Sequence, residues 1–455
     1  MSLWNSNQRR GKTGILSEKP NIAENNDMKN IFTIGILLFL ITGCQPKVYL
    51  MPPPVSLTEN SSLFDLTEDN KDENLLYTLY ATNRQPFDRP SGSVGYTIFP
   101  SDTLRLGLVV HRVGEVGMSW EDLHRLSFSD KRDKDLLLHQ VFARQRTEYD
   151  IEDDIEHVSS GGEGFFDAIN KVLDRAYDKD ILIYVHGANS GFYRATAQGA
   201  QWYHFTGHNS VVLTFSWPSA ENLLKYKTDV LHAKKTVPAF AKLIAILAAH
   251  TKAKNINIVA YSAGTQVVVP GLAYLRKQYP DVSAEALKEK LRLGEIYFAA
   301  PDMNFDAFCD QYLEFKDIVY RTTINLNQND SVLRLAAYQN GVSRLGRPNR
   351  NDITDEEEQL LIEALQTPYF NVLNVGASEA LKIGGSHSSW YNHSWVSNDL
   401  LLMLYFHGSP EERGLVRRIH ENGAQDYFFP EDYEEKIGKI IEERRHEFVD
   451  SKVDK

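Results

Sequence analysis

The chain has 455 residues, of which 42% are hydrophobic and 24% are charged. A chain of this length and composition can bury a sizeable core, so extensive disorder is excluded. The formal net charge of −12 offers no basic field to hold a phosphate backbone, which argues against nucleic acid as a partner. The chain has only two cysteines, Cys44 and Cys309, which excludes a disulfide framework and a cysteine-based zinc cluster.

A short apolar run at residues 31–41 resembles a secretory signal. A membrane-spanning helix needs about 20 apolar residues, so we expect residues 28–43 to be a cleaved signal peptide. Ile41-Thr42-Gly43-Cys44 resembles the lipobox of bacterial lipoproteins, which implies that Cys44 becomes a lipidated first residue. By the same resemblance, Gln45 favours the outer membrane of the bacterial cell envelope. The alternative is a buried helix followed by an ordinary thiol.

The remaining chain divides by composition. Residues 1–27 precede a complete signal, so we interpret them as an upstream extension of the true start at Met28. The polar, proline-containing stretch 44–74 predicts a flexible tether. We expect one α/β domain over residues 75–408 and a charged, solvated helical segment over 409–455.

Hydrophobic patterning predicts the fold class. From residue 75 to about 146, short strand-like runs separated by turn residues indicate an antiparallel start. Apolar runs of strand length then alternate with amphipathic helices, which predicts a mostly parallel sheet with helices on both faces. The expected strands are 181–185, 211–215, 256–260, 296–300, 318–326 and 370–375, and the expected helices include 227–249, 263–278 and 396–406.

The main chemical signal is Ala260-Tyr261-Ser262-Ala263-Gly264, which lies between a predicted strand and a predicted helix. A sharp strand-to-helix turn raises one side chain above the sheet edge and requires small residues on either side of it. Ser262 occupies that position, and the helix N-terminus favours a developing oxyanion there. The alternative is that Ser262 only caps the helix.

A second signal is the earlier strand end at His186-Gly187-Ala188. Acyl transfer needs two N–H donors for the oxyanion, one from the residue after the nucleophile and one from a loop after an earlier strand. We expect Ala263 and Ala188 to supply them. His186 directly follows a buried strand, which favours an orienting hydrogen bond over a role as base.

The acid and the base are expected later in the chain, in the order Ser, Asp or Glu, His. Asp330 follows the second strand after the nucleophile and is the favoured acid, and Asp302 is the alternative acid. Asp302 alternatively shapes the pocket wall, and for either aspartate the other interpretation is a helix cap. His393 stands just before a helix and is the favoured base. His387 is the alternative, because its Gly- and Ser-rich stretch is poorly suited to holding an imidazole in place.

These residues together resemble the α/β-hydrolase superfamily and, more narrowly, a bacterial family of uncharacterised hydrolase-like proteins. The shared motifs are Thr82-Asn83-Arg84, Val185-His186-Gly187, Phe215-Ser216-Trp217-Pro218-Ser219, Ser262-Ala263-Gly264, Asn329-Asp330 and His393. The resemblance covers about residues 75–408 and implies an α/β-hydrolase fold. Tyr261 departs from the family, which often has His before the serine.

The expected function is that of an envelope-anchored serine hydrolase that cleaves a carboxylic ester or related acyl substrate. The substrate is expected to be a small molecule or a lipid, and the membrane is contacted through the lipid anchor. Alternatives are a peptidase or thioesterase with the same triad, or a noncatalytic scaffold that keeps the fold for binding. Phe215 to Ser219, Tyr226 and Asp229 are candidates for the lining of the substrate pocket, and Trp217 and Pro218 fit a packed loop corner equally well. No phosphate loop and no dinucleotide fingerprint occur, so no cofactor is expected, and no metal is expected either.

Overall fold

The computed structural model describes residues 47–57, 74–129, 132–155, 160–176 and 178–449. Its strands are β1 (Leu75–Asp88), β2 (Val94–Val113), β3 (Leu138–Asp150), β4 (Ile181–Val185), β5 (Val211–Phe215), β6 (Ile256–Tyr261), β7 (Leu293–Ala299), β8 (Val319–Leu326), β9 (Phe370–Asn374), β10 (Val416–Ile419) and β11 (Gln425–Phe428). The predicted strands therefore differ from the observed ones by only a few residues at their ends.

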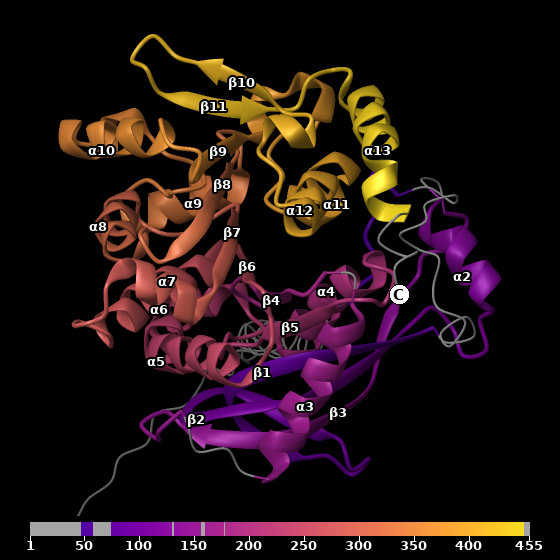
Figure 1. The fold of residues 1–455 in the computed structure, drawn as a ribbon. Coiled ribbons are helices and arrows are strands. Elements are labelled where there is room, and N and C mark those ends of the chain that lie inside the picture. The colour runs from indigo at the N-terminus through magenta and orange to yellow at the C-terminus, as the bar shows by residue number, and fades with distance from the viewer. Residues whose placement is uncertain (1–46, 58–73, 130–131, 156–159, 177, 450–455) are drawn as a thin grey trace, which may run out of the picture. The chain divides into compact units, whose positions relative to one another are not determined.

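The strands form one eleven-stranded sheet in the order β10-β11-β9-β8-β7-β6-β4-β5-β1-β2-β3 (Figure 1). The strands from β11 through β9, β8, β7, β6, β4 and β5 to β1 pair in parallel. Strands β1, β2 and β3 pair antiparallel at one edge, as the sequence predicted. The fold is a mostly parallel α/β sheet with an antiparallel N-terminal edge.

Helices cover both faces of the sheet. The α-helices are α2 (Trp120–Ser127), α3 (Ser160–Arg175), α4 (Phe192–Phe205), α5 (Tyr226–His250), α6 (Thr265–Lys277), α7 (Ala284–Leu291), α8 (Phe305–Phe315), α9 (Ser331–Asn340), α10 (Asp355–Leu365), α11 (Ser389–Asn392), α12 (Ser394–Phe406) and α13 (Tyr433–Val449). The short 3-10 helices are η3 (Leu223–Lys225), η4 (Ser262–Gly264), η5 (Arg350–Asp352), η6 (Val375–Ala377), η7 (Glu379–Leu381) and η8 (Glu411–Arg413).

Strand β4 is apolar along its whole length because it is covered on both faces of the sheet. Ile181, Ile183 and Val185 belong to the core that contains α3, α5, α6 and α8. Leu182 and Tyr184 belong to the opposite core, which contains α4 and α12. Because successive side chains of a strand point to opposite faces, a strand that is covered on both sides reads as a continuous apolar run.

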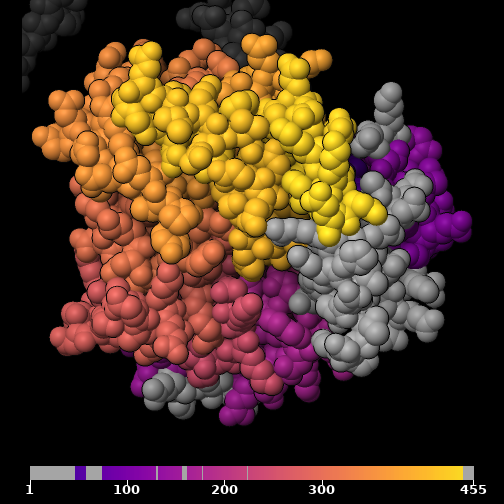
Figure 2. All heavy atoms as spheres, turned by 45° about the horizontal axis from the view of Figure 1, so that its top comes forward, coloured from indigo at the N-terminus to yellow at the C-terminus, as the bar shows by residue number. Residues whose placement is uncertain are grey.

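The C-terminal segment is not only helical, which corrects the expectation for residues 409–455. Strands β10 and β11 form a hairpin, and β11 pairs in parallel with β9 through Tyr427 and Leu373, so this segment extends the sheet of the main domain. Charged residues hide the strand pattern, since Arg418 lies opposite Asp426 and forms an ion pair with it at 2.6 Å. Helix α13 follows the hairpin as predicted (Figure 2, yellow).

Residues 47–57 pack onto the domain, which corrects the expectation of a free tether for this part of 44–74. Val48, Leu50, Met51 and Leu57 are buried in the core beneath α4 and α12. The backbone N–H of Leu50 donates to the Leu136 carbonyl at 2.7 Å, and that of Ser56 donates to Asn398 Oδ1 at 2.9 Å. The sequence expectation missed that apolar side chains are interspersed among the prolines. We name residues 47–57 the strap.

The signal peptide, Cys44, the extension over residues 1–27 and residues 58–73 lie outside the described residues. Of the helices that the structure describes, none combines the length and the apolar character needed to cross a bilayer.

Candidate active site

Ser262 stands at the sharp turn between β6 and α6. Its φ of 52° lies in the left-handed region, where a non-glycine residue is strained. A Cβ at Gly264 would lie 2.7 Å from the carbonyl oxygens of Val185 and His186, so only glycine fits two residues after the serine. Ala260 is fully buried at the other crowded position. The local backbone is therefore that of a nucleophile elbow.

Three side chains form a hydrogen-bonded relay at this turn. Ser262 Oγ lies 2.8 Å from His387 Nε2, and His387 Nδ1 lies 2.7 Å from Asp330 Oδ2. Because a carboxylate only accepts, His387 donates through Nδ1 and accepts the serine hydroxyl at Nε2. Ser262 keeps 7% of its surface exposed and the His387 side chain keeps 12%, so the relay is not sealed from solvent.

The two carboxylate oxygens of Asp330 make different interactions, one with a helix N-terminus and one with His387. Oδ1 accepts from the backbone N–H groups of Val332 and Leu333, each at 2.9 Å, and so caps helix α9. Oδ2 accepts from His387. The cap and the relay were alternatives in the sequence, but the fully buried carboxylate satisfies both.

His393 does not reach Ser262, which corrects the expectation that it is the base. Its Nδ1 accepts from the backbone N–H of Trp395 at 3.2 Å and caps α12. Burial lowers the pKa of His393, partly offset by a backbone hydrogen bond to Leu381 and the charge of Glu434. The alternative base, His387, occupies the expected position.

The loop around His387 is held in place despite its glycines and serines. Asn327 Nδ2 donates to the carbonyls of Gly384 and Ser386, at 3.0 and 3.1 Å. The backbone N–H and the hydroxyl of Ser331 both donate to the Gly385 carbonyl. These partners lie more than fifty residues away in sequence, so local composition gave no sign of them.

Asp302, the alternative acid, contacts neither Ser262 nor His387 through its side chain. Its Oδ1 accepts from Arg344 Nε, and its Oδ2 accepts from the Tyr226 hydroxyl, both at 2.6 Å. Gln266 Nε2 donates to the Asp302 carbonyl at 2.8 Å. Only the backbone N–H of Asp302 reaches the elbow, where it donates to the Ser262 carbonyl. Asp302 therefore belongs to a buried ion pair beside Ser262.

The loop after β4 lies against Ser262. A Cβ at Gly187 would stand 3.0 Å from the Cβ of Ser262, so glycine permits this approach. Ala188 follows, and Asn189 has a left-handed φ of 55°. The backbones of Ala188 and Ala263 thus flank Ser262, one in the adjoining loop and one in the next residue.

His186 is a structural residue, in line with the orienting role inferred from sequence. Its Nδ1 donates to the Gly187 carbonyl at 2.7 Å, and its ring stacks on Trp217. The Trp217 indole donates to the His186 carbonyl. Burial, with a smaller contribution from Arg84, lowers the pKa of His186 to about 3, so the imidazole is neutral.

Two buried charged residues hold the loop after β4, and sequence reasoning gave neither of them this role. Asp229 accepts from the backbone N–H of Asn189 at 3.1 Å and from that of Ala220 at 2.7 Å. Arg84 Nη2 donates to the Ser190 carbonyl at 2.8 Å. Arg84 lies in the Thr82-Asn83-Arg84 motif, and this motif was the sequence feature that could have pointed to its role. Asp229 was expected near the pocket, but its carboxylate ties two loops together.

Comparison with known protein families identifies the family of this chain. Residues 164–394 match the family described as "Alpha/beta hydrolase of unknown function (DUF900)". The chain belongs to this family. No curated protein matches the chain.

Solved structures similar to this α/β hydrolase include two of esterase B from Lactobacillus rhamnosis. One, described as inhibited, is 10% identical over 36% of this chain and 63% of that one, with a TM-score of 0.21. The other is 12% identical over 37% of this chain and 64% of that one, with a TM-score of 0.22. The alignments thus span less than two thirds of the esterase.

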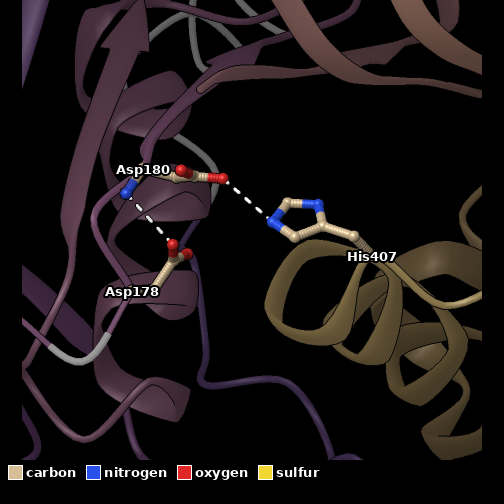
Figure 3. Close-up of side chains that lie close together, drawn as sticks. All are labelled: Asp178, Asp180 and His407. Carbon is tan, nitrogen blue, oxygen red and sulfur yellow. Dashed lines mark hydrogen bonds and ion pairs between the residues drawn. The ribbon is translucent and has the colours of Figure 1, made fainter. Parts of the chain in front are cut away.

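A second polar cluster of this α/β hydrolase lies where β4 begins. His407 Nε2 lies 3.1 Å from Asp180 Oδ2, and the backbone N–H of Asp180 donates to Asp178 (Figure 3). These three side chains could hold a cation by their spacing. Both oxygens of Asp180 already accept from amides of Asn255 and Asn257, however. We therefore interpret the cluster as an ion pair.

The protonation of His407 supports this interpretation. Burial alone would lower the pKa of His407, but its hydrogen bonds to Asp180 and Glu295 raise it to about 9. Burial, together with the charge of Asp180, raises the pKa of Asp178 to about 7. The histidine is thus cationic at neutral pH and neutralises part of the acidic cluster.

Proposed function

We propose that this protein is a serine hydrolase that cleaves a carboxylic ester or a related acyl substrate. The observation that carries the proposal is the continuous relay from Ser262 through His387 to Asp330, with both links shorter than 3 Å. A noncatalytic scaffold would need the fold but not this alignment of three side chains at a strained turn.

The proposed reaction follows from the relay. Ser262 Oγ attacks the acyl carbonyl, and His387 Nε2 takes its proton and then delivers it to the leaving alcohol. Asp330 holds the imidazole in the required tautomer and stabilises its protonated form. Water, activated by the same imidazole, then attacks the acyl-enzyme and releases the acid and free Ser262.

The oxyanion is assigned to the backbone N–H groups of Ala188 and Ala263. The close approach of Gly187 to Ser262 supports the first donor, and the position of Ala263 at the start of the helical turn supports the second. Asp229 and Arg84 are positioning residues, because they act on the loop that carries Ala188 and contact no reacting atom.

We further propose that Cys44 carries a lipid that holds the enzyme on the bacterial envelope, at the outer membrane. The lipobox-like sequence supports this proposal. The strap adds a geometric consequence, since Val48 is already buried in the domain. The four residues from Cys44 to Val48 span at most about 14 Å. A lipid on Cys44 would therefore hold the domain close to the membrane, without a long flexible linker between them.

Hydrolysis of p-nitrophenyl esters of increasing acyl length tests the proposal, with thioester and peptide substrates in parallel. Turnover that Ser262→Ala abolishes while the thermal unfolding of the variant stays unchanged would support the enzyme, and ester preference would exclude the peptidase and thioesterase alternatives. A well-folded wild type that turns over none of these substrates would favour the scaffold.

A further inference from the structure

Arg194, in the first turn of α4, has hydrogen-bonding capacity that the described residues leave unused. Its Nη1 donates to the Asn189 carbonyl at 3.4 Å, which is longer than a normal N–H···O bond. A guanidinium offers five N–H donors, and that of Arg194 makes no other hydrogen bond and no ion pair within the part of the chain that the structure describes. The side chain is half-buried, so solvent still reaches it. Its positive charge is therefore available to a ligand.

Arg194 lies beside the residues that we assign to the reaction. The carbonyl that it contacts belongs to Asn189, in the loop that also carries the proposed oxyanion donor. A Cβ at Gly187, in the same loop, would lie 3.0 Å from Cβ of Ser262 and 3.3 Å from Cδ1 of Tyr261. One short loop thus contacts the free guanidinium on one side, and Ser262 and the tyrosine before it on the other.

Two half-buried tyrosines extend this polar surface. The ring centroid of Tyr261 lies 5.3 Å from that of His387 and 6.1 Å from that of Tyr391. Burial and the neighbouring Tyr391 raise the pKa of Tyr261 well above its ordinary value, and the charge of Arg194 opposes this rise. The same charge opposes the rise that burial causes in the pKa of Tyr184. The guanidinium therefore faces phenols that keep their protons at neutral pH.

The tyrosine pair adds a neutral donor to the cation. The hydroxyls of Tyr261 and Tyr391 share a hydrogen bond, which uses one of their two O–H donors and leaves the other for a ligand. A cation and a phenol donor side by side match a carboxylate, which only accepts. We name Arg194, Tyr261 and Tyr391 the anion subsite.

We propose that the anion subsite binds a carboxylate of the substrate, so that the enzyme prefers esters that carry a negative charge near the scissile acyl group; this rests on the function proposed above. A planar guanidinium pairs with a carboxylate through two parallel N–H···O bonds, and the free tyrosine hydroxyl donates to a remaining lone pair. The chain carries a net charge of −12, so its overall field does not attract an anion and a local cation is required.

Two pairs of esters test the proposal, and the members of each pair are similar in size but differ in charge. Mono-p-nitrophenyl adipate against p-nitrophenyl hexanoate places the charge on the acyl side. 4-Carboxyphenyl hexanoate against 4-carbamoylphenyl hexanoate places it on the alcohol side. The ratio of kcat/KM between charged and neutral esters is measured for wild type, Arg194→Gln, Arg194→Lys and Tyr391→Phe. The control is Arg125→Gln, at an exposed arginine on α2.

The wild type should prefer the charged member of at least one pair. Arg194→Gln should lower this preference about thirtyfold, because the charge-assisted hydrogen bonds are lost. Arg194→Lys keeps the charge and should lower it less, Tyr391→Phe should lower it about fivefold, and Arg125→Gln should leave it as in the wild type. The absence of a preference in both pairs, or a preference that survives Arg194→Gln, would overturn the proposal.

Failure of the subsite and failure of the proposed function give different results. A wild type that hydrolyses the neutral esters without preferring a charged one would refute the subsite alone. A wild type that hydrolyses none of the four would refute the proposed function, and calorimetry of Ser262→Ala with the two charged esters then decides the subsite. Binding that is lost when Arg194→Gln is added supports it, whereas no binding to Ser262→Ala refutes it.

Discussion

The carboxylate of Asp229 accepts a hydrogen bond from the backbone N–H of Asn189, the residue directly after the proposed oxyanion donor Ala188. Asp229 is buried and also accepts from Ser219 Oγ and from the backbone of Ala220. One side chain thus couples the loops that follow β4 and β5. In the proposed mechanism, the geometry of the oxyanion site therefore depends on Asp229, which contacts no reacting atom.

Asp229→Asn should lower kcat about tenfold or more, with a smaller change in KM. The amide replaces one acceptor oxygen by a donor, so a backbone N–H of Asn189 or Ala220 loses its partner. Steady-state kinetics on an ester gives the kcat and KM effects, and circular dichroism checks the fold. An unchanged kcat in a folded variant would remove Asp229 from the positioning role.

Asp330→Asn and Asp302→Asn should separate the relay acid from the structural acid. The first change should lower kcat about a thousandfold, because the amide cannot both accept from His387 Nδ1 and keep the imidazole tautomer. The second should mainly lower the free energy of unfolding, because buried Arg344 loses its charged partner. Kinetics and thermal unfolding of both variants check this assignment, and the reverse pattern would refute it.

Much of the fold was readable from the sequence, because each buried strand is a continuous apolar run bounded by turn residues. The elbow at Ser262 was readable for the same local reason, since a small-residue pattern sits between a strand and a helix. The choice of the histidine base was wrong because the position of the correct side chain depends on hydrogen bonds from residues far away in sequence. The Gly- and Ser-rich sequence around His387 indicates a loosely held loop, yet Asn327 and Ser331 hold this loop in place by hydrogen bonds.

The errors at the two ends of the domain have a related cause. Charged residues mask the alternation of β10 and β11, and the hairpin is stabilised by pairing with β9, far away in sequence. The apolar residues of the strap are scattered among prolines, so they show neither a helical nor a strand period. Both segments are ordered by tertiary contacts rather than by local propensity.

Gly264→Ala should destabilise the protein by about 2 kcal/mol and lower activity. The new methyl group would meet the backbone carbonyl oxygens of Val185, the last residue of β4, and of His186, which follows it, and this backbone cannot move away without disturbing the sheet. Gly164→Ala is the matched control, because a Cβ there meets nothing and alanine favours the helix. Urea unfolding of both variants measures the difference. Equal stabilities would show that the elbow tolerates a side chain at 264.

The stability of the protein should fall as pH rises from about 6.5 to 9, and His407 should account for part of the loss. The folded state raises the pKa of His407 from 6.5 to about 9, so its contribution is complete below the unfolded value and disappears through the folded one. The raised pKa of Asp178, about 7, acts in the same direction, because the folded state binds that proton more tightly.

His407→Asn removes this titration and suits the left-handed φ of 49° at the position. The unfolding free energies of wild type and variant, measured by urea titration between pH 6 and pH 10, should therefore converge as pH rises. One proton accounts for at most about 1.4 kcal/mol per pH unit. A difference between the two proteins that stays constant over this range would contradict the raised pKa.

In the proposed mechanism, His387 rather than His393 activates Ser262. The most direct measurement is the rate of fluorophosphonate labelling of Ser262, followed by mass spectrometry, in His387→Asn and His393→Asn. Asparagine at 393 still caps α12, so that variant should label at the wild-type rate, whereas His387→Asn should label about a hundredfold more slowly. Rapid labelling of His387→Asn together with loss of labelling in a folded His393→Asn would show that His393, and not His387, activates Ser262.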